Sequence, residues 1–315
     1  MHYDLLSVAY VCYLKNDYSY LEKWCQFYND DNVKGVIANL YFMTKDEMKE
    51  ELHPDYYRDD VSVVSMFKIS TAIVKHFLPQ TDLLFSIEGC DYLDVSDLDT
   101  LYSLGLRNIL PVWNNKNKYA SGNRSSDGLT IEGQNLIDKA IELGISIDLS
   151  HANEQSFYDI TNYIKQKQQQ GFKVHVMASH SNSIYLCHRD RNLTDNQIKV
   201  IGQLGGMIGV FSNRNFVVPY EIKDIATLEE KRTMYLQHIR HIVSLIGTCH
   251  VGVATDDMNF CEGMYKDTAI YEYSTIASFL KQDLEKHFNS SDVFRIMYGN
   301  MKNRYDQLKD QINKI

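Results

Sequence analysis

The sequence predicts a single (β/α)8 barrel of the α/β class, and three observations favour it. Short runs rich in β-branched residues alternate with longer helical patterns, which calls for parallel strands joined by right-handed crossovers. Side chains able to bind metal follow many different runs, whereas an open doubly wound sheet gathers its ligands at one switch point. The length of 315 residues is ordinary for one barrel, so we expect residues 1–315 to form one domain.

Seven runs of strand-forming residues predict seven strands, and the extended start of the chain predicts an eighth. Short apolar runs bounded by turn-forming residues are typical of strands covered on both faces. The eighth run leaves almost no residues for a strand, so we expect the first strand to be short or distorted. In chain order the seven runs are 35–42, 83–88, 108–113, 146–150, 173–179, 206–212 and 250–255.

Helical patterns lie between the predicted strands. Capping residues mark two of the helix starts most clearly: Thr194 precedes DNQIKVIGQL, and Ser290 or Ser291 precedes DVFRIM. Apolar residues recur at helical spacing in four longer stretches. These stretches are 131–143, 153–168, 194–204 and 226–246.

Composition argues against several classes of partner. The formal net charge is −9 and no basic face is concentrated anywhere, so we expect no nucleic acid partner. No apolar run approaches the roughly 18 residues that span a bilayer, and the start lacks the pattern of a signal peptide. The six cysteines form no CxxC pair. We therefore expect a cytoplasmic protein without a membrane partner and with reduced thiols.

Five side chains that bind divalent cations stand at the ends of the strand-like runs. A lone histidine at a strand end is more often bonded to the backbone, so each signal is weak alone. Five such groups at the same end of a barrel instead indicate a metallohydrolase, in which cations activate a water molecule. The five are His2, Asp4, Glu88, His151 and His180.

Strand alternation predicts where these side chains point. Residues i and i+2 of a strand share a face, so the imidazole and carboxylate of the opening HYD triplet can bind one cation together. By the same rule Ile147, Leu149 and His151 form one row, and VHVMASH contains a similar row that ends in His180. We expect both rows to face the barrel axis, with the histidines at the mouth.

The order of these segments resembles the renal (membrane) dipeptidase family, the M19 metallopeptidases of the amidohydrolase superfamily. HYDLL is similar to the family's opening HxD, IEG to its bridging glutamate, and IDLSH followed by ASHSN to its two later histidines. CHRDRN, VGVATDD and YGN look like its arginine loop, its catalytic-aspartate strand and its closing helix signature. The resemblance covers most of the chain and implies a barrel of the metal-dependent hydrolase type.

The resemblance also implies a pair of zinc ions. Carried over by position, His2, Asp4 and Glu88 would hold one Zn²⁺. Glu88, His151 and His180 would hold the other. A carboxylate suits the shared position because each of its oxygens can take one cation, and the nucleophile would be a hydroxide that bridges the two zincs.

Further residues are assigned by the same resemblance. Asp256 matches the general acid/base, and Arg191 matches the residue that binds the terminal carboxylate of the substrate. The neighbouring Arg189 could fill the second role instead. A carboxylate bound at a fixed distance from the metals would limit the substrate to dipeptides. By analogy with the family, and because two-fold homo-oligomers are common, we expect a homodimer.

One departure from the family concerns the fourth strand. Many members have a histidine there that contacts the substrate carbonyl, whereas this chain has Trp113. Tryptophan offers one N–H donor and a broad apolar wall, so it would line the pocket rather than bind an oxyanion. Asn114, Asn117 and Asn213 are further candidates for contact with the substrate.

The sequence leaves three functions open. The first is a zinc-dependent dipeptidase, whose partner is a short peptide with a free C-terminal carboxylate. The second keeps the site and changes the bond to another amide, an acyl-amino acid or a lactone. The third is a metal-retaining binding protein without turnover, for which Trp113 and the truncated first strand argue.

Overall fold

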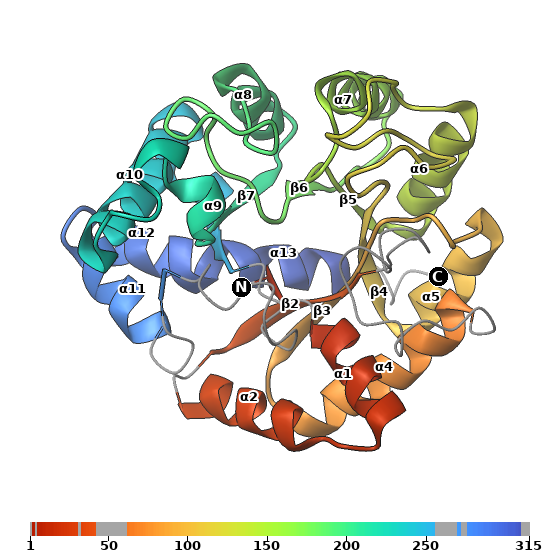
Figure 1. The fold of residues 1–315 in the computed structure, drawn as a ribbon. Helices are drawn as coiled ribbons and strands as arrows, with labels where there is room; N and C mark the ends of the chain where they lie inside the picture. Colours follow the sequence, from red (N-terminus) through yellow and green to blue (C-terminus); the bar gives the residue numbers. More distant parts are fainter. Residues whose placement is uncertain are drawn as a thin grey trace.

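A computed structural model describes residues 2–3, 5–30, 33–41, 62–255, 270–271 and 276–309, with the backbone alone for residues 2 and 3. Its strands form one eight-stranded sheet in the order β1 to β8, and every neighbouring pair is parallel. Helices surround the sheet (Figure 1). The predicted α/β barrel architecture is confirmed.

The strands follow the predicted order, and most are shorter than the sequence suggested. Their bounds are β1 His2–Tyr3, β2 Gly35–Tyr41, β3 Asp82–Glu88, β4 Leu106–Leu110, β5 Ser146–Asp148, β6 Val176–Ala178, β7 Met207–Phe211 and β8 Val251–Ala254.

The α-helices occupy the intervals between the strands and the C-terminal region. Their bounds are α1 Leu5–Lys15, α2 Ser19–Asp30, α4 Val63–Phe77, α5 Leu98–Leu104, α6 Ile131–Leu143, α7 Glu154–Gln169, α8 Asp195–Gln203, α9 Arg214–Val217, α10 Leu228–Ile246, α11 Ile276–Glu285, α12 Ser290–Phe294 and α13 Asn300–Lys309. Short helical turns lie at η2 Val95–Asp97, η3 Tyr220–Ile222, η4 Thr248–His250 and η6 Arg295–Gly299.

The first strand is as short as the sequence predicted. β1 pairs with β2 through His2 beside Ile37 and Tyr3 beside Ala38. It also contacts β8, so the first and last strands of the sheet meet. Because the sheet curves back on itself, the carboxyl ends of strands that are distant in sequence lie at one rim of the barrel.

Capping explains where several helices begin. Thr194 caps α8 as predicted, and its hydroxyl and the Gln197 side chain form a reciprocal capping box. The predicted cap of α12 was wrong by one position, because Asn289 rather than Ser290 or Ser291 accepts the hydrogen bond from Asp292 N. An asparagine oxygen at this position satisfies the same orphan N–H group that a serine would.

The interior is divided between two apolar clusters. The larger one joins alternate strand residues to the surrounding helices, for example Ile147 with Leu136 and Phe157. The smaller one lies inside the barrel, where Ile37, Leu84 and Met177 meet Leu308 of α13. Helix α13 therefore closes one end of the barrel, and it crosses behind the strands in Figure 1.

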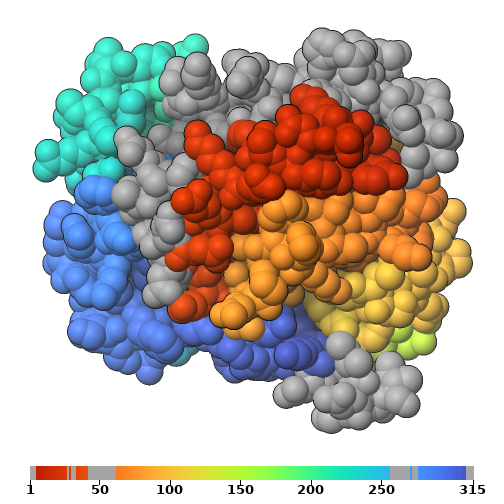
Figure 2. All heavy atoms as spheres, turned by 90° about the horizontal axis from the view of Figure 1, so that it is seen from below, coloured from red at the N-terminus to blue at the C-terminus, as the bar shows by residue number. Residues whose placement is uncertain are grey.

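The N-terminal helices cover one flank of the barrel. Helix α1 contacts both α4 and β2, and α2 contacts both α1 and α4. Figure 2 shows this face, with the N-terminal helices in red beside α4 in orange and the C-terminal helices in blue. Within the part of the chain that the structure describes, no helix is long and apolar enough to cross a membrane.

A buried histidine connects α10 to the loop before α8. His238 is fully buried; its Nδ1 accepts from Ser183 N at 3.1 Å, and its Nε2 donates to Val217 O at 3.1 Å. Burial lowers the pKa of His238 to about 4, because a charged ring would lose its solvation and Nδ1 could no longer accept.

Acid is therefore expected to destabilise the metal-free protein. The unfolded chain protonates His238 near pH 6.5 and the folded chain only near pH 4, so stability is full above pH 6.5 and falls as the pH drops. By pH 5 this one residue should cost about 2 kcal/mol. Urea unfolding at pH 7 and pH 5 checks the prediction. His238→Asn should lose less stability than the native chain over this interval, and an equal loss would contradict the assignment.

Candidate metal centre

Glu88 is the last residue of β3, and its carboxylate points into the barrel mouth. The side chain is 3% exposed. The fully buried Asn39 of β2 donates from Nδ2 to Oε2 of Glu88 at 2.5 Å. This hydrogen bond holds one carboxylate oxygen and leaves the other, Oε1, facing the ends of β5 and β6.

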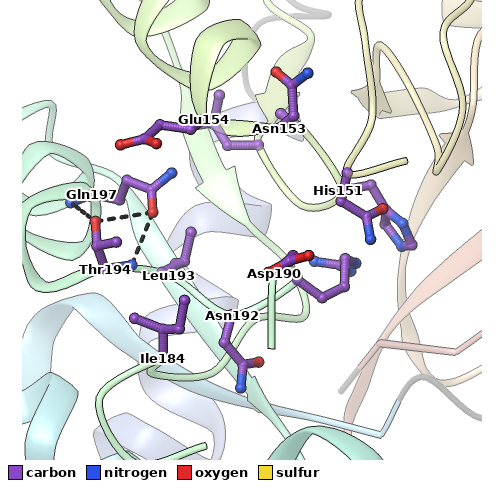
Figure 3. A pocket seen from close by; sticks show the side chains of 13 residues that line it. His151, Asn153, Glu154, Ile184, Asp190, Asn192, Leu193, Thr194 and Gln197 are labelled. Carbon is purple, nitrogen blue, oxygen red and sulfur yellow. Dashed lines mark hydrogen bonds between the residues drawn. The ribbon is translucent and has the colours of Figure 1, made fainter. Parts of the chain in front are cut away.

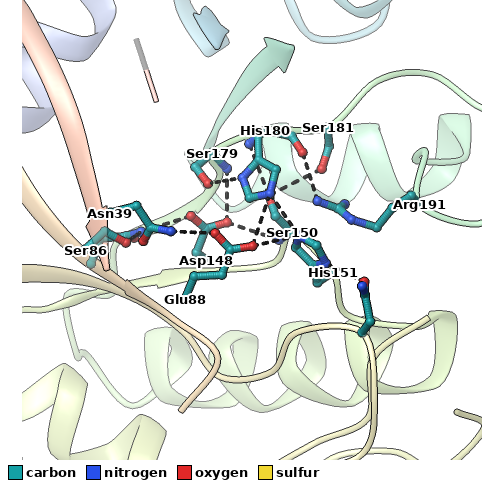
Figure 4. A network of polar contacts seen from close by, with 12 residues as sticks. Asn39, Ser86, Glu88, Asp148, Ser150, His151, Ser179, His180, Ser181 and Arg191 are labelled. Carbon is teal, nitrogen blue, oxygen red and sulfur yellow. Dashed lines mark hydrogen bonds and ion pairs between the residues drawn. The ribbon is translucent and has the colours of Figure 1, made fainter. Parts of the chain in front are cut away.

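Two histidine rings converge on that second oxygen. Nε2 of His151 lies 2.8 Å from Glu88 Oε1, and Nε2 of His180 lies 3.5 Å from the same atom. The two Nε2 atoms are 3.0 Å apart. Figure 4 shows the three side chains pointing toward one another from three different strand ends. Glu88, His151 and His180 form the one group of potential metal ligands found among the described residues.

The backbone at His151 explains how its ring reaches the cluster. The residue has a φ of 71°, in the left-handed region that non-glycine residues rarely adopt. Its Nδ1 lies 2.9 Å from Oδ1 of Asn114. The ring is thus aimed by an unusual backbone turn and held by an asparagine from the loop after β4.

His180 is held by its own neighbours. Its Nδ1 lies 2.8 Å from the hydroxyl of Ser179, and its main-chain N–H donates to Ser150 Oγ at 3.2 Å. The ring packs edge-on against Phe211 of β7. His180 is completely buried, so its imidazole has little freedom to leave the cluster.

The protonation states suit a cation. Burial, with Arg191 as the next cause, lowers the pKa of His151 to about 3, so the ring is neutral at pH 7. Burial alone would raise the pKa of Glu88, but its interactions with the rings of His180 and His151, hydrogen bonds included, hold it well below its usual range. A neutral imidazole beside an ionised carboxylate is the form in which both groups bind metal.

The hydrogen-bond partners favour the tautomer that binds metal. With the ring proton of His151 on Nδ1, where it donates to Oδ1 of Asn114, Nε2 keeps its lone pair. In this tautomer Nε2 faces the carboxylate oxygen of Glu88 and Nε2 of His180, and electron pairs converge at close range. A positive charge between the three atoms removes the repulsion, which is what a bound divalent cation supplies.

The spacing of the three atoms also fits a metal. Ligands at about 2.0–2.1 Å in tetrahedral directions lie roughly 3.3 Å from one another. The three measured separations are 2.8, 3.0 and 3.5 Å. The donor set of one carboxylate and two imidazoles is among those that zinc prefers.

Three predicted site residues cannot be placed with their side chains. Asp4 and Asp256 lie outside the described residues, and only the backbone of His2 is described. That backbone lies beside Ile37, two residues before Asn39 on β2.

Arg191 lies between the cluster and a neighbouring pocket. Its side chain is 7% exposed, and Nη2 donates to His180 O at 3.3 Å. The pocket has a volume of about 260 Å³ and is lined by Arg191 and His151 together with the first residues of α7 and α8. Figure 3 shows Glu154 and Asn153 on one side of it and Thr194 and Gln197 on another. Arg189 is not among the lining residues; its Nε donates to Asn215 O.

Trp113 forms a wall beside the cluster. Its ring centroid lies 5.8 Å from that of His151 and 4.7 Å from that of Tyr41. The guanidinium of Arg124 lies over the Trp113 ring, 5.7 Å from its centroid. The tryptophan thus presents an apolar surface next to a predicted ligand, as its residue type suggested.

Two further predicted substrate contacts, Asn117 and Asn213, are engaged in local hydrogen bonds. Asn117 donates to Pro111 O and accepts from the N–H groups of the loop at residues 119–120, so its amide orders that loop. Asn213 caps α9 and accepts from Asn215 N at 3.0 Å. Neither residue lines the pocket beside His151.

The predicted direction of one strand row was wrong. Ile147 and Leu149 do not face the axis but pack into the outer cluster against helices. Asp148 takes the inward position, where its carboxylate accepts from Asn108 Nδ2 of β4 at 2.9 Å. β5 ends at Asp148, and the left-handed backbone of His151 then breaks the alternation and returns the ring to the mouth.

The second row was also misread. Val176 and Ala178 belong to the outer cluster, while Met177 faces the barrel interior. β6 ends at Ala178, so His180 lies beyond the strand and its direction is set by the loop. Strand parity cannot be extended past the last paired residue.

Polar residues inside the barrel were missed at the sequence level. Asn39, Asn108 and Asp148 are all 0–1% exposed, and each is a polar residue in a strand run that also contains buried apolar residues. That interruption is the signal that could have found them, because a buried polar side chain needs partners.

The fold and the cluster define a class. A parallel α/β barrel with a carboxylate and two imidazoles at the carboxyl ends of its strands is a barrel of the metal-dependent hydrolase type. The chain belongs to the membrane dipeptidase family, peptidase family M19, whose family model matches residues 55–310.

Individual relatives share part of their length with this chain. An uncharacterized protein of Klebsiella pneumoniae is 33% identical over 180 residues, which is 54% of this chain and 62% of that protein. An uncharacterized dipeptidase of Schizosaccharomyces pombe is 28% identical over 182 residues, which is 55% of this chain and 41% of that protein. The matches therefore span less than two thirds of these relatives.

Solved structures show the same fold over nearly the whole chain. A metallo peptidase from Rhodobacter sphaeroides, liganded with a phosphinate mimic of the dipeptide L-Ala-D-Ala, has a TM-score of 0.72 and 18% identity. The match covers 98% of this chain and 97% of that one. The probable dipeptidase PvdM from Pseudomonas aeruginosa has a TM-score of 0.69 and 15% identity, with 91% and 88% covered.

Proposed function

We propose that this protein is a zinc-dependent dipeptidase that cleaves short peptides with a free C-terminal carboxylate. The observation that carries the proposal is the convergence of Glu88, His151 and His180 on one point at the barrel mouth. Membership of the M19 family and the likeness to a peptidase liganded with a dipeptide mimic support it.

The proposed ligand sets share Glu88. This residue, His151 and His180 would hold one zinc ion, and Glu88 with His2 and Asp4 would hold a second. A metal pair held by these residues would supply a lowered pKa for a bound water molecule and polarisation of the scissile carbonyl.

The chain supplies the proton transfer and the substrate contacts. Asp256, two positions after β8 in the sequence, accepts the proton of the attacking water and returns it to the leaving amine. Arg191 binds the C-terminal carboxylate through two parallel charged hydrogen bonds. The pocket beside it is large enough for one amino acid side chain, and Trp113 excludes water from the other side of His151.

Metal removal tests this function. Dialysis against a chelator is expected to abolish hydrolysis of a dipeptide such as Ala-Ala, and added Zn²⁺ should restore it, because the metal is what would lower the pKa of the attacking water and polarise the carbonyl. Product release is measured by an amine-reactive dye.

Three outcomes of this experiment separate the functions. Full activity after complete removal of metal would contradict the proposal. Binding of the dipeptide without any product would favour a binding protein without turnover. Zinc-dependent cleavage of acyl-amino acids or lactones, with dipeptides untouched, would favour the broader amidohydrolase function.

A further inference from the structure

A buried acid lies beside the candidate metal ligands Glu88, His151 and His180. Asp148 is 1% exposed and is the last residue of β5. Its Oδ1 accepts from the main-chain N–H of Ser150 at 3.1 Å and from that of Ser179 at 3.0 Å. Its Oδ2 accepts from Asn108 Nδ2 at 2.9 Å. Figure 4 shows Asp148 beside Glu88 and below Ser179.

These hydrogen bonds tie the ends of two neighbouring strands together. Ser150 directly precedes His151, and Ser179 directly precedes His180. Ser150 extends the connection, since its hydroxyl accepts from His180 N at 3.2 Å. One carboxylate oxygen thus fixes the peptide groups that lead into both imidazoles.

The backbone conformation of His151 depends on this connection. A non-glycine residue with a φ of 71° is strained and persists only where its surroundings enforce it. The hydrogen bond from Ser150 N to Asp148 closes the turn just before that residue. Without it, the chain could relax toward an extended conformation and carry the ring away from Glu88.

We propose that Asp148 is a positioning residue that holds His151 and His180 in their metal-binding orientation through hydrogen bonds to the main chain. The inference rests on the metal-binding role proposed above for these histidines. It assigns the action to the acceptor atoms of Asp148 rather than to its charge, because Oδ1 bonds two N–H groups that lead directly into the ligands.

Two substitutions separate the acceptor from the charge. Asp148→Ala removes both acceptors. Asp148→Asn keeps a side-chain oxygen that accepts from the two N–H groups, and its NH2 group then faces Asn108. The Oδ1 atom of Asn108 has no hydrogen-bond partner among the described residues. Rotation of the Asn108 amide lets this oxygen accept from the new NH2 group. Ser86, which now accepts from Asn108, can then donate from its hydroxyl.

Zinc affinity is the readout, measured with Zn²⁺ alone in competition with a chromophoric chelator. Asp148→Ala is expected to weaken binding by about 10- to 100-fold, the usual effect of removing a group that orients metal ligands. Asp148→Asn should bind zinc nearly as tightly as the native chain.

Asp283 provides the matched control. It is a buried acid on α11 that accepts from Tyr271 and Lys286, far along the chain from the cluster. Asp283→Ala should lower the melting temperature of the metal-free protein and leave zinc affinity unchanged, which separates positioning from general stability.

Each remaining outcome decides the matter. Unchanged affinity in Asp148→Ala would overturn the proposal, and equal losses in both Asp148 variants would assign the effect to charge and overturn it too. If Asp148→Ala does not fold, weak zinc binding by folded Asp148→Asn would overturn it. Absence of zinc binding by the native chain would instead contradict the proposed function.

Discussion

Replacing Glu88 with glutamine is expected to abolish zinc binding and dipeptide hydrolysis while leaving the protein folded. The glutamine oxygen can still accept from Asn39, and its NH2 group then faces Nε2 of His151 and of His180. The glutamine NH2 group can donate hydrogen bonds to the lone pairs of the two imidazoles in the metal-free protein, and it occupies the place of the cation. We expect kcat/KM to fall by at least about a thousandfold, or roughly 4 kcal/mol.

Metal content and thermal melting check this result. Elemental analysis should find the zinc of the native protein lost from Glu88→Gln, with a melting temperature close to that of the metal-free native chain. Glu142→Gln is a matched control, because Glu142 is an exposed acid paired with Lys139 on α6. A folded Glu88→Gln protein with full zinc content and normal turnover would refute the shared role of this carboxylate.

Replacing Arg191 with methionine is expected to raise KM for dipeptides and to change kcat much less. The guanidinium is nearly buried, so a substrate carboxylate paired with it loses its partner in a site of low polarity. Removing one member of such a pair costs about 2–4 kcal/mol, a rise in KM of roughly 30- to 700-fold. Steady-state kinetics with Ala-Ala measure both constants.

Variants of the same loop sharpen the comparison. Arg191→Lys should show an intermediate KM, since lysine keeps the charge and loses the two parallel bonds. Arg189→Met should behave like the native chain, because that side chain is engaged with Asn215 and Tyr220. Unchanged KM in Arg191→Met would mean that no substrate carboxylate binds there, and would favour the amide, acyl-amino acid or lactone alternative.

Local patterns predicted most of the barrel. The helix over 131–143 has the predicted bounds, because Thr130 caps it and the left-handed Gly144 ends it. Most strands proved shorter than their apolar runs. β5, for example, ends at Asp148 although the run continues to residue 150, because pairing stops where the chain turns toward the mouth. An apolar run predicts which residues are buried, but it does not predict the last residue that pairs with the neighbouring strand.

The sequence predicted which residues form the site, but it did not predict in which direction the strand side chains point. Glu88 and His180 are 92 positions apart, yet both follow parallel strands, and the carboxyl ends of such strands meet at one rim. The inward position of Asp148 was missed because alternation was counted back from His151, whose left-handed backbone reverses the parity. A single left-handed residue cannot be recognised from composition. When alternation is counted back through such a residue, every strand residue before it is assigned to the wrong face.

The most direct test of the central claim is anomalous scattering at the zinc absorption edge from crystals of the zinc-loaded protein. We expect a peak about 2.0–2.2 Å from a Glu88 oxygen and from Nε2 of both His151 and His180. A second peak should lie on the other side of the same carboxylate, toward β1. Zinc bound elsewhere on the molecule, with the two Nε2 atoms still 3.0 Å apart and no peak between them and Glu88, would contradict the account.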